Sequence, residues 1–304
     1  MGRGDPVTTA PTEAVSGASA PRGRRGTPAV LGVAPFALYV LLFLAVPTVL
    51  SVATGFADGD GRFTTANVLA LADPVVVSAF GASLGLSAVT AVVGAVLGAV
   101  VCLALLGSDP RGALRTVVDA AASVLAQFGG VMLAFAFIAT IGVQGLVTTL
   151  LAGAGVDLYA DGVWLYQLPG LVLPYLYFQV PLMVLTFLPA LEGLRPEWAE
   201  ANAVLGGGRL GYWRHVAVPV LAPSFLGCVL LLFANAFSSF ATAAALISQG
   251  AQIVPLQIRA ALVSETVLGR ENLAGALALG MLAVMVVLMS GYALLQRRAR
   301  RWQR

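Results

Sequence analysis

Few side chains in this sequence could carry out covalent chemistry. His215 is the sole histidine, and no ordered acid or nucleophile accompanies it, so we expect a surface residue. Cys102 and Cys228 each fall inside an apolar run and show neither a disulfide framework nor metal-ligand spacing. The chain has no lysine, which a Walker A phosphate loop requires, so any ATP that is used must bind another subunit. The sequence therefore predicts a non-catalytic chain without a cofactor or metal.

Neutral polar side chains inside the apolar runs are more informative. Four of them recur at i, i+3, i+4 and i+7, the spacing of one helical face: Asn235, Ser238, Ser239 and Thr242. Such a face meets either a partner helix or a water-filled path, and the spacing allows both. Gln127 is a further candidate for lining a path. Ionisable residues are nearly absent from the runs, and Asp119 near the start of one of them is expected to be interfacial, which argues against a proton relay.

Composition indicates that lipid is the solvent of these runs. The 304 residues are 59% hydrophobic and 10% charged, whereas soluble domains carry about 25% charged residues. A spanning helix needs about 20 mainly apolar residues. The sequence predicts an all-α bundle with six spanning helices, near residues 29–57, 76–106, 117–141, 164–190, 220–246 and 272–296.

Arginine counting orients the six predicted spans. Only Arg62, Arg259 and Arg270 fall on one side, and the rest of the 17 basic residues fall on the other. Arginine-rich connectors stay in the cytoplasm. Both termini are therefore expected in the cytoplasm of a bacterial plasma membrane. The net charge of +3 reports this topology and gives no reason to infer nucleic-acid binding.

The two ends of the chain are expected to lie outside the spanning domain of residues 28–296. Residues 1–27 are predicted to be a disordered polar tail, and residues 297–304 a basic cytoplasmic tail. The run after Arg24 and Arg25 is about twice the 7–15 residues of a secretory signal, so we interpret it as a retained span. A twin-arginine export signal is the alternative.

The connector at 191–219 interrupts the apolar pattern and predicts two short helices outside the bilayer. Pro196 and Glu197 favour a helix start. Glycines at 206–208 are expected to end this helix, and a second piece is expected to run from Arg209 to Val216 and stop at Pro219. The first helix carries an apolar stripe at helical spacing, made of Leu194, Trp198, Ala201 and Leu205.

This connector resembles the cytoplasmic EAA loop of membrane permeases in binding-protein-dependent ABC importers. The loop reads roughly Glu-Ala-Ala, three residues, Gly, and about a dozen residues to a Pro. This chain supplies Glu200, Ala201, Asn202, Gly206 and Pro219 before its second-last span, where the family keeps the loop. Asn202 and the residue after Gly206, a glycine, replace the alanines that are common in the family.

The resemblance implies that the two short helices are coupling helices docked in a cleft of an ATPase subunit. Glu200 would make a charged contact, Gly206 would permit the turn, and Trp198 and Leu205 would give apolar contact. It further implies a MetI-like permease fold, a second permease subunit that is the same or homologous, an external solute-binding protein, and ATP bound only by the partner. The alternative is a helical hairpin lying on lipid headgroups.

A weaker resemblance concerns the substrate. Phe240, Ala241 and Thr242 are similar to an element in permeases of the spermidine/putrescine, ferric iron and thiamine group. A polyamine, iron, thiamine or phosphonate is therefore the expected class of solute. The connector at 247–271 is expected to meet the binding protein.

Three other functions are alternatives to a permease. A secondary transporter of a small solute predicts inverted repeats and intramembrane charges, and neither is evident. A membrane enzyme predicts clustered His, Cys or acidic residues, which this sequence lacks. A non-transporting scaffold would tolerate loss of Glu200 and Gly206.

Overall fold

The computed structural model describes residues 27–301, apart from 110, 248–252 and 264–271. In these residues the secondary structure is helical, with an isolated β-bridge between Ala57 and Phe63. Six helical segments are long and apolar enough to cross a membrane: Gly32–Thr54, Pro74–Leu105, Gly130–Gly153, Leu168–Glu192, Arg209–Phe237 and Leu273–Leu294. The predicted all-α fold with six spanning helices is confirmed. Most of the predicted tail 1–27 lies outside the described residues, whereas the predicted basic tail begins inside a helix that continues to Arg301.

The chain divides into two compact units, residues 1–49 and 50–304. Most of the first span lies in the first unit, as helix α1 (Thr27–Val40), the π-helical turn η1 (Leu41–Ala45) and the start of α2 (Val46–Thr54). Val46 follows the π turn and Pro47 comes next, in the first turn of α2. Proline lacks an N–H and clashes with the carbonyl one helical turn earlier, and a wider turn relieves that clash. The proline is thereby accommodated without ending the helix.

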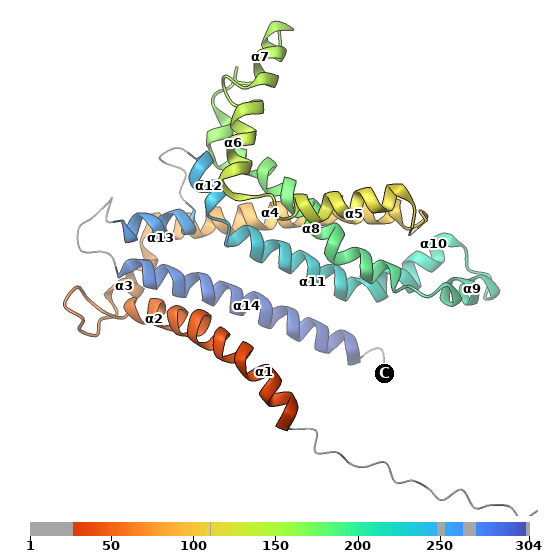
Figure 1. Ribbon diagram of the computed structural model, residues 1–304, viewed down its shortest axis with the longest axis horizontal. Coiled ribbons are helices and arrows are strands. Elements are labelled where there is room, and N and C mark those ends of the chain that lie inside the picture. Colours follow the sequence, from red (N-terminus) through yellow and green to blue (C-terminus); the bar gives the residue numbers. More distant parts are fainter. Residues whose placement is uncertain (1–26, 110, 248–252, 264–271, 302–304) are drawn as a thin grey trace, which may run out of the picture. The chain divides into compact units, whose positions relative to one another are not determined.

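Three long helices that pack on one another form the centre of the second unit: α4 (Pro74–Leu105), α8 (Val172–Glu192) and α11 (Val218–Phe237). Three more flank them (Figure 1): α5 (Ala113–Leu125) packs on α8, while α14 (Leu273–Arg301) packs on α11 and on α13 (Val254–Leu262). Shorter elements connect these helices: α3 (Ala66–Leu69), η2 (Ala70–Ala72), α6 (Gly130–Ile141), α7 (Leu146–Gly153), η3 (Trp164–Tyr166), η4 (Leu168–Leu171), α9 (Pro196–Val204), α10 (Arg209–Tyr212), η5 (Trp213–Ala217) and α12 (Ala241–Leu246).

Helix α4 shows how the sequence builds this centre. Asp73 caps its first turn by accepting a hydrogen bond from the Val75 N–H at 3.0 Å, and Pro74 takes the first helical position. Further along, a β-carbon on Gly98 would lie 2.5 Å from Met183 Cβ of α8. Glycine at this position therefore permits the close approach of α4 and α8.

Two predicted spans are broken in the structure. The third was expected as one helix over 117–141, but α5 ends at Leu125 and α6 begins at Gly130, and the span candidate is Gly130–Gly153. The fifth was expected over 220–246, but α11 ends at Phe237 and α12 begins at Ala241. The predicted single face of Asn235, Ser238, Ser239 and Thr242 is therefore wrong, because these residues do not lie on one continuous helix.

The expected stop at Pro219 is also wrong. Helix α10, the π turn η5 and α11 form one helical segment from Arg209 to Phe237, and Pro219 lies inside it. As in the first span, a π turn ends two residues before the proline and accommodates its missing N–H. The second short helix of the connector is thus continuous with the fifth span.

Candidate functional site

The connector between α8 and α11 folds as a helix, a tight turn and a second helix. Helix α9 begins at Pro196, with Glu197 in its first turn, as predicted. Gly206 has φ +80°, a left-handed conformation that favours glycine, so its predicted role in ending the helix is confirmed. Its N–H donates to Ala203 O at 2.9 Å, which closes the end of α9. The turn therefore depends on the residue that the sequence pattern singled out.

Asn202 holds the same turn from its other side. Its Nδ2 donates to Gly207 O at 2.9 Å and to Gly208 O at 3.3 Å. The Gly207 N–H in turn donates to Asn202 O at 2.8 Å. Sequence reasoning treated Asn202 as a small departure from alanine and missed this function. Asparagine side chains often hydrogen-bond to nearby backbone groups, and this tendency could have indicated the contact with the turn.

Three large apolar side chains of this connector are almost fully exposed. Val204, Leu205 and Leu210 are 87%, 87% and 82% exposed. Such exposure is unusual for large apolar side chains outside a lipid core and marks an interaction surface when the residues are contiguous. Glu200 and Ala201 are also exposed, whereas Trp198 is half-buried. The predicted stripe is divided, because Leu194 packs against the core cluster of α4, α8 and α11.

His215 lies on η5 and is exposed, with Nδ1 3.0 Å from Gly211 O. Among the described residues no cluster of His, Cys, Asp or Glu could hold a metal ion. Neither observation gives this surface a catalytic group.

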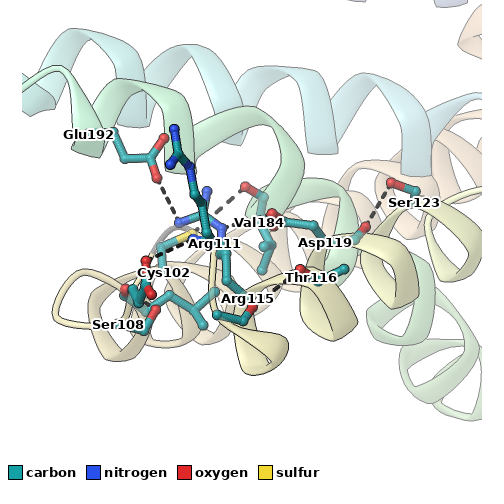
Figure 2. A network of polar contacts seen from close by, with 12 residues as sticks. Cys102, Ser108, Arg111, Arg115, Thr116, Asp119, Ser123, Val184 and Glu192 are labelled. Carbon is teal, nitrogen blue, oxygen red and sulfur yellow. Dashed lines mark hydrogen bonds and ion pairs between the residues drawn. The ribbon is translucent and has the colours of Figure 1, made fainter.

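The base of the connector is tied to α5 by a half-buried cation, Arg115 (Figure 2). Arg115 Nε lies 2.8 Å from Asp119 Oδ2 in its own helix, and Nη1 lies 2.6 Å from Glu192 Oε1 at the end of α8. Hydrogen bonding to Asp119 and then to Glu192 raises the pKa of Arg115 above its ordinary value. Sequence reasoning used Arg115 only to count charges. The Arg115–Asp119 spacing of i, i+4 was a signal for the local pair, but no pattern indicated Glu192.

The two helix breaks lie against each other. The Gly130 N–H, at the start of α6, donates to Thr242 Oγ1 of α12 at 2.9 Å. Thr242 is 1% exposed, so its hydroxyl joins the two broken spans. Tyr175 of α8 adds a second link, because its hydroxyl donates to Ser239 O at 3.1 Å.

The other predicted pathway residues are placed around this junction. Gln127, in the break after α5, is exposed. Ser238 is exposed, and its hydroxyl donates to Ala234 O at 2.9 Å. Asn235 and Ser239 are half-buried. The structure thus brings Thr242 to the residues that follow Gln127 and leaves Gln127 and Ser238 accessible.

A buried polar seam between α4 and α8 was not predicted. Its members are Ser83, Ser87 and Thr90 of α4 and Gln179 of α8. Gln179 Nε2 donates to Thr90 Oγ1 at 3.0 Å, while Gln179 Oε1 is buried without a partner. Ser83 Oγ accepts the Val254 N–H at 2.9 Å. The spacing of four and three along α4 was the signal that could have revealed this seam.

Comparison with known proteins adds to this geometry. No protein-family model matches the chain. A curated relative, the sulfate transport system permease protein CysT of Salmonella typhimurium, is 33% identical over 84 residues. That match covers 28% of this chain and 29% of the relative, so the chain aligns with less than a third of the relative's length.

Solved structures match over much more of the chain. The structure of a bacterial ABC transporter that imports the acidic polysaccharide alginate matches with a TM-score of 0.72 and 17% identity, over 89% of this chain and 95% of that one. An inward-facing structure of the MetNI methionine ABC transporter matches with a TM-score of 0.56 and 15% identity, over 75% of this chain and 99% of that one. The fold is therefore the one found in these ABC transporters.

Proposed function

We propose that this chain is the transmembrane permease subunit of an ATP-driven ABC importer. The observation that carries the proposal is the connector at 191–219, in a chain with the fold of ABC transporter membrane subunits. Its glycine turn places α9 and α10 at the surface with three large apolar side chains exposed beside Glu200. The connector also exposes Arg195, Arg209 and Arg214, so its charge is mixed, and the large exposed apolar side chains are what suit it to a cleft of a soluble ATPase.

The proposed mechanism divides the work between subunits. The ATPase binds ATP and closes on α9 and α10, and this chain catalyses no bond change. Movement of the connector shifts the spans between inward-facing and outward-facing states, which ATP and the loaded binding protein each favour differently. A second permease subunit, identical or homologous, supplies the other half of the path. The chain lies in the bacterial plasma membrane, with both termini cytoplasmic.

The solute is proposed only by class. The similar proteins are named for sulfate, alginate and methionine, which share little chemistry. The expectation of a polyamine, iron, thiamine or phosphonate rests on Phe240, Ala241 and Thr242 alone. One of the similar structures holds an alginate pentasaccharide-bound periplasmic protein, which supports delivery by an external binding protein here. Nothing in the comparisons favours an ion-coupled secondary transporter.

A pull-down tests the proposal. The chain is co-expressed with the ATPase encoded nearest to it and purified in detergent through a tag on the permease. Glu200→Arg and Gly206→Leu are expected to lose the ATPase, the second because residue 206 has φ +80°. Gly208→Leu is the matched control, since Gly208 has φ −82° and open space around it. Absence of the ATPase from the wild-type preparation, or equal binding by all variants, would overturn the proposal.

A further inference from the structure

Arg115 connects the base of the coupling connector to a neighbouring helix. Its side chain is 12% exposed, and it bonds two carboxylates that are each 44% exposed. Asp119 belongs to α5 itself, so that bond stays within one helix. Glu192 ends α8, so the second bond crosses between helices (Figure 2). Only residues 193–195 separate Glu192 from the start of α9 at Pro196.

Glu192 is the last residue of α8, so its bond to Arg115 holds the point from which the connector starts. A carboxylate at a helix C-terminus meets the negative end of the helix dipole, which is unfavourable without a cation nearby. Arg115 supplies that cation. Leu191, the preceding residue, is fully buried, and Leu194 packs on the same core cluster. The base of the connector is therefore fixed to α5 and to the core, while α9 beyond it is exposed.

The other end of α5 leads to the helix breaks. Its 13 residues span about 20 Å at the usual rise of a helix. A short turn then reaches Gly130, whose N–H donates to Thr242 of α12. A β-carbon on Gly130 would lie 3.5 Å from Ala241 Cβ, so α6 and α12 leave room for little more than a methyl group there. Helix α5 thus bridges the base of the coupling connector and the break in the fifth span.

We propose that Arg115 is a positioning residue that makes α5 the rigid link between the ATPase-docking connector and the junction of α6 with α12. This inference rests on the proposed function. Rigid helices joined by specific polar contacts are physical carriers of coupling between distant sites. The Arg115–Glu192 bond transmits movement of α9 to α5, and the Gly130–Thr242 bond transmits it to the broken spans. Asp119 orients the guanidinium but joins no second element.

The two carboxylates provide a matched comparison. Glu192→Gln and Asp119→Asn each remove one negative charge that faces Arg115, and the two acids are equally exposed. Only Glu192→Gln weakens the bond between helices. Spin labels are placed at Met132 on α6 and Val96 on α4, which are 68% and 51% exposed. Cys102 and Cys228 are changed to alanine in this background. The distance between the labels is measured in the complex with the ATPase, with and without Mg-ATP and vanadate.

The wild-type complex is expected to show a nucleotide-dependent change in the label distance. Asp119→Asn should keep that change. Glu192→Gln should lose it while still co-purifying with the ATPase and hydrolysing ATP, a result that simple misfolding would not give. Equal behaviour of the two variants, or an unaltered change in Glu192→Gln, would overturn the inference. A wild-type chain that never binds the ATPase would instead refute the proposed function.

Discussion

The side chain of Asn202 occupies the space that a β-carbon on residue 207 would need. An ideal Cβ on Gly207 would lie 2.6 Å from Asn202 Cγ and 2.7 Å from Nδ2, both far inside van der Waals contact. The same amide donates to Gly207 O and Gly208 O. The two departures from the common EAA pattern are therefore coupled, because the Asn202 side chain fills the space that a side chain at residue 207 would need.

A double-mutant cycle tests this pairing. Gly207→Ala alone should cost about 1–3 kcal/mol in local stability of the turn, because its methyl group clashes with the Asn202 amide. Adding Asn202→Ala should recover much of that loss, since the clash disappears. Hydrogen exchange of the amides between 202 and 208 measures the effect. Additive effects of the two substitutions would contradict the pairing.

Close packing of α4 on α8 is expected to be sensitive to a single methyl group. Gly98→Ala places a carbon 2.5 Å from Met183 Cβ and 2.9 Å from Val180 O. Overpacking of this kind costs about 1–3 kcal/mol. Gly85→Ala in the same helix meets open space and should leave the thermal midpoint in detergent unchanged or raised. Equal midpoints for the two variants would show that α4 and α8 do not approach this closely.

The junction of the two broken spans should depend on the Thr242 hydroxyl. Thr242→Val keeps the shape but removes the acceptor of the Gly130 N–H, which is expected to cost about 1–3 kcal/mol. Thr242→Ser retains the oxygen and serves as the control. Thermal unfolding in detergent compares the two. A valine variant as stable as the serine variant would mean that Gly130 finds another partner.

Replacing Gln179 is expected to cost less stability than replacing its hydrogen-bond partner, Thr90. Thr90→Val leaves the buried Gln179 Nε2 without its acceptor and should cost about 1–3 kcal/mol. Gln179→Met removes that donor together with the unpartnered Oε1 and should cost less. The double variant should be more stable than Thr90→Val alone. Unfolding midpoints of the three variants check this order, and a Gln179→Met variant less stable than Thr90→Val would reverse it.

Helix breaks show where pattern analysis of this chain fails. The polar residues Asn235, Ser238, Ser239 and Thr242 fit a helical face by spacing, yet α11 ends at Phe237 and α12 restarts at Ala241. Helical spacing holds only while the backbone stays helical. Here backbone groups in and beside the breaks find partners elsewhere, in the Thr242 hydroxyl and the Tyr175 hydroxyl. Those partners come from other helices, so no local pattern could reveal them.

By itself the sequence determined that the chain is all-α with six membrane-spanning helices, and it determined the turn in the connector at 191–219. The bilayer requires long apolar helices, and these can be recognised in the sequence as long runs of apolar residues. The helix start at Pro196 and the turn at Gly206 could be predicted because the backbone preferences of proline and glycine are local. Only the tertiary structure decided the pairing of Asn202 with Gly207, the Arg115–Glu192 link and the junction of Gly130 with Thr242. In a chain whose lipid-facing and core-facing sides are both apolar, hydrophobic pattern does not tell which faces pack, so contacts between helices emerge only when the chain is folded.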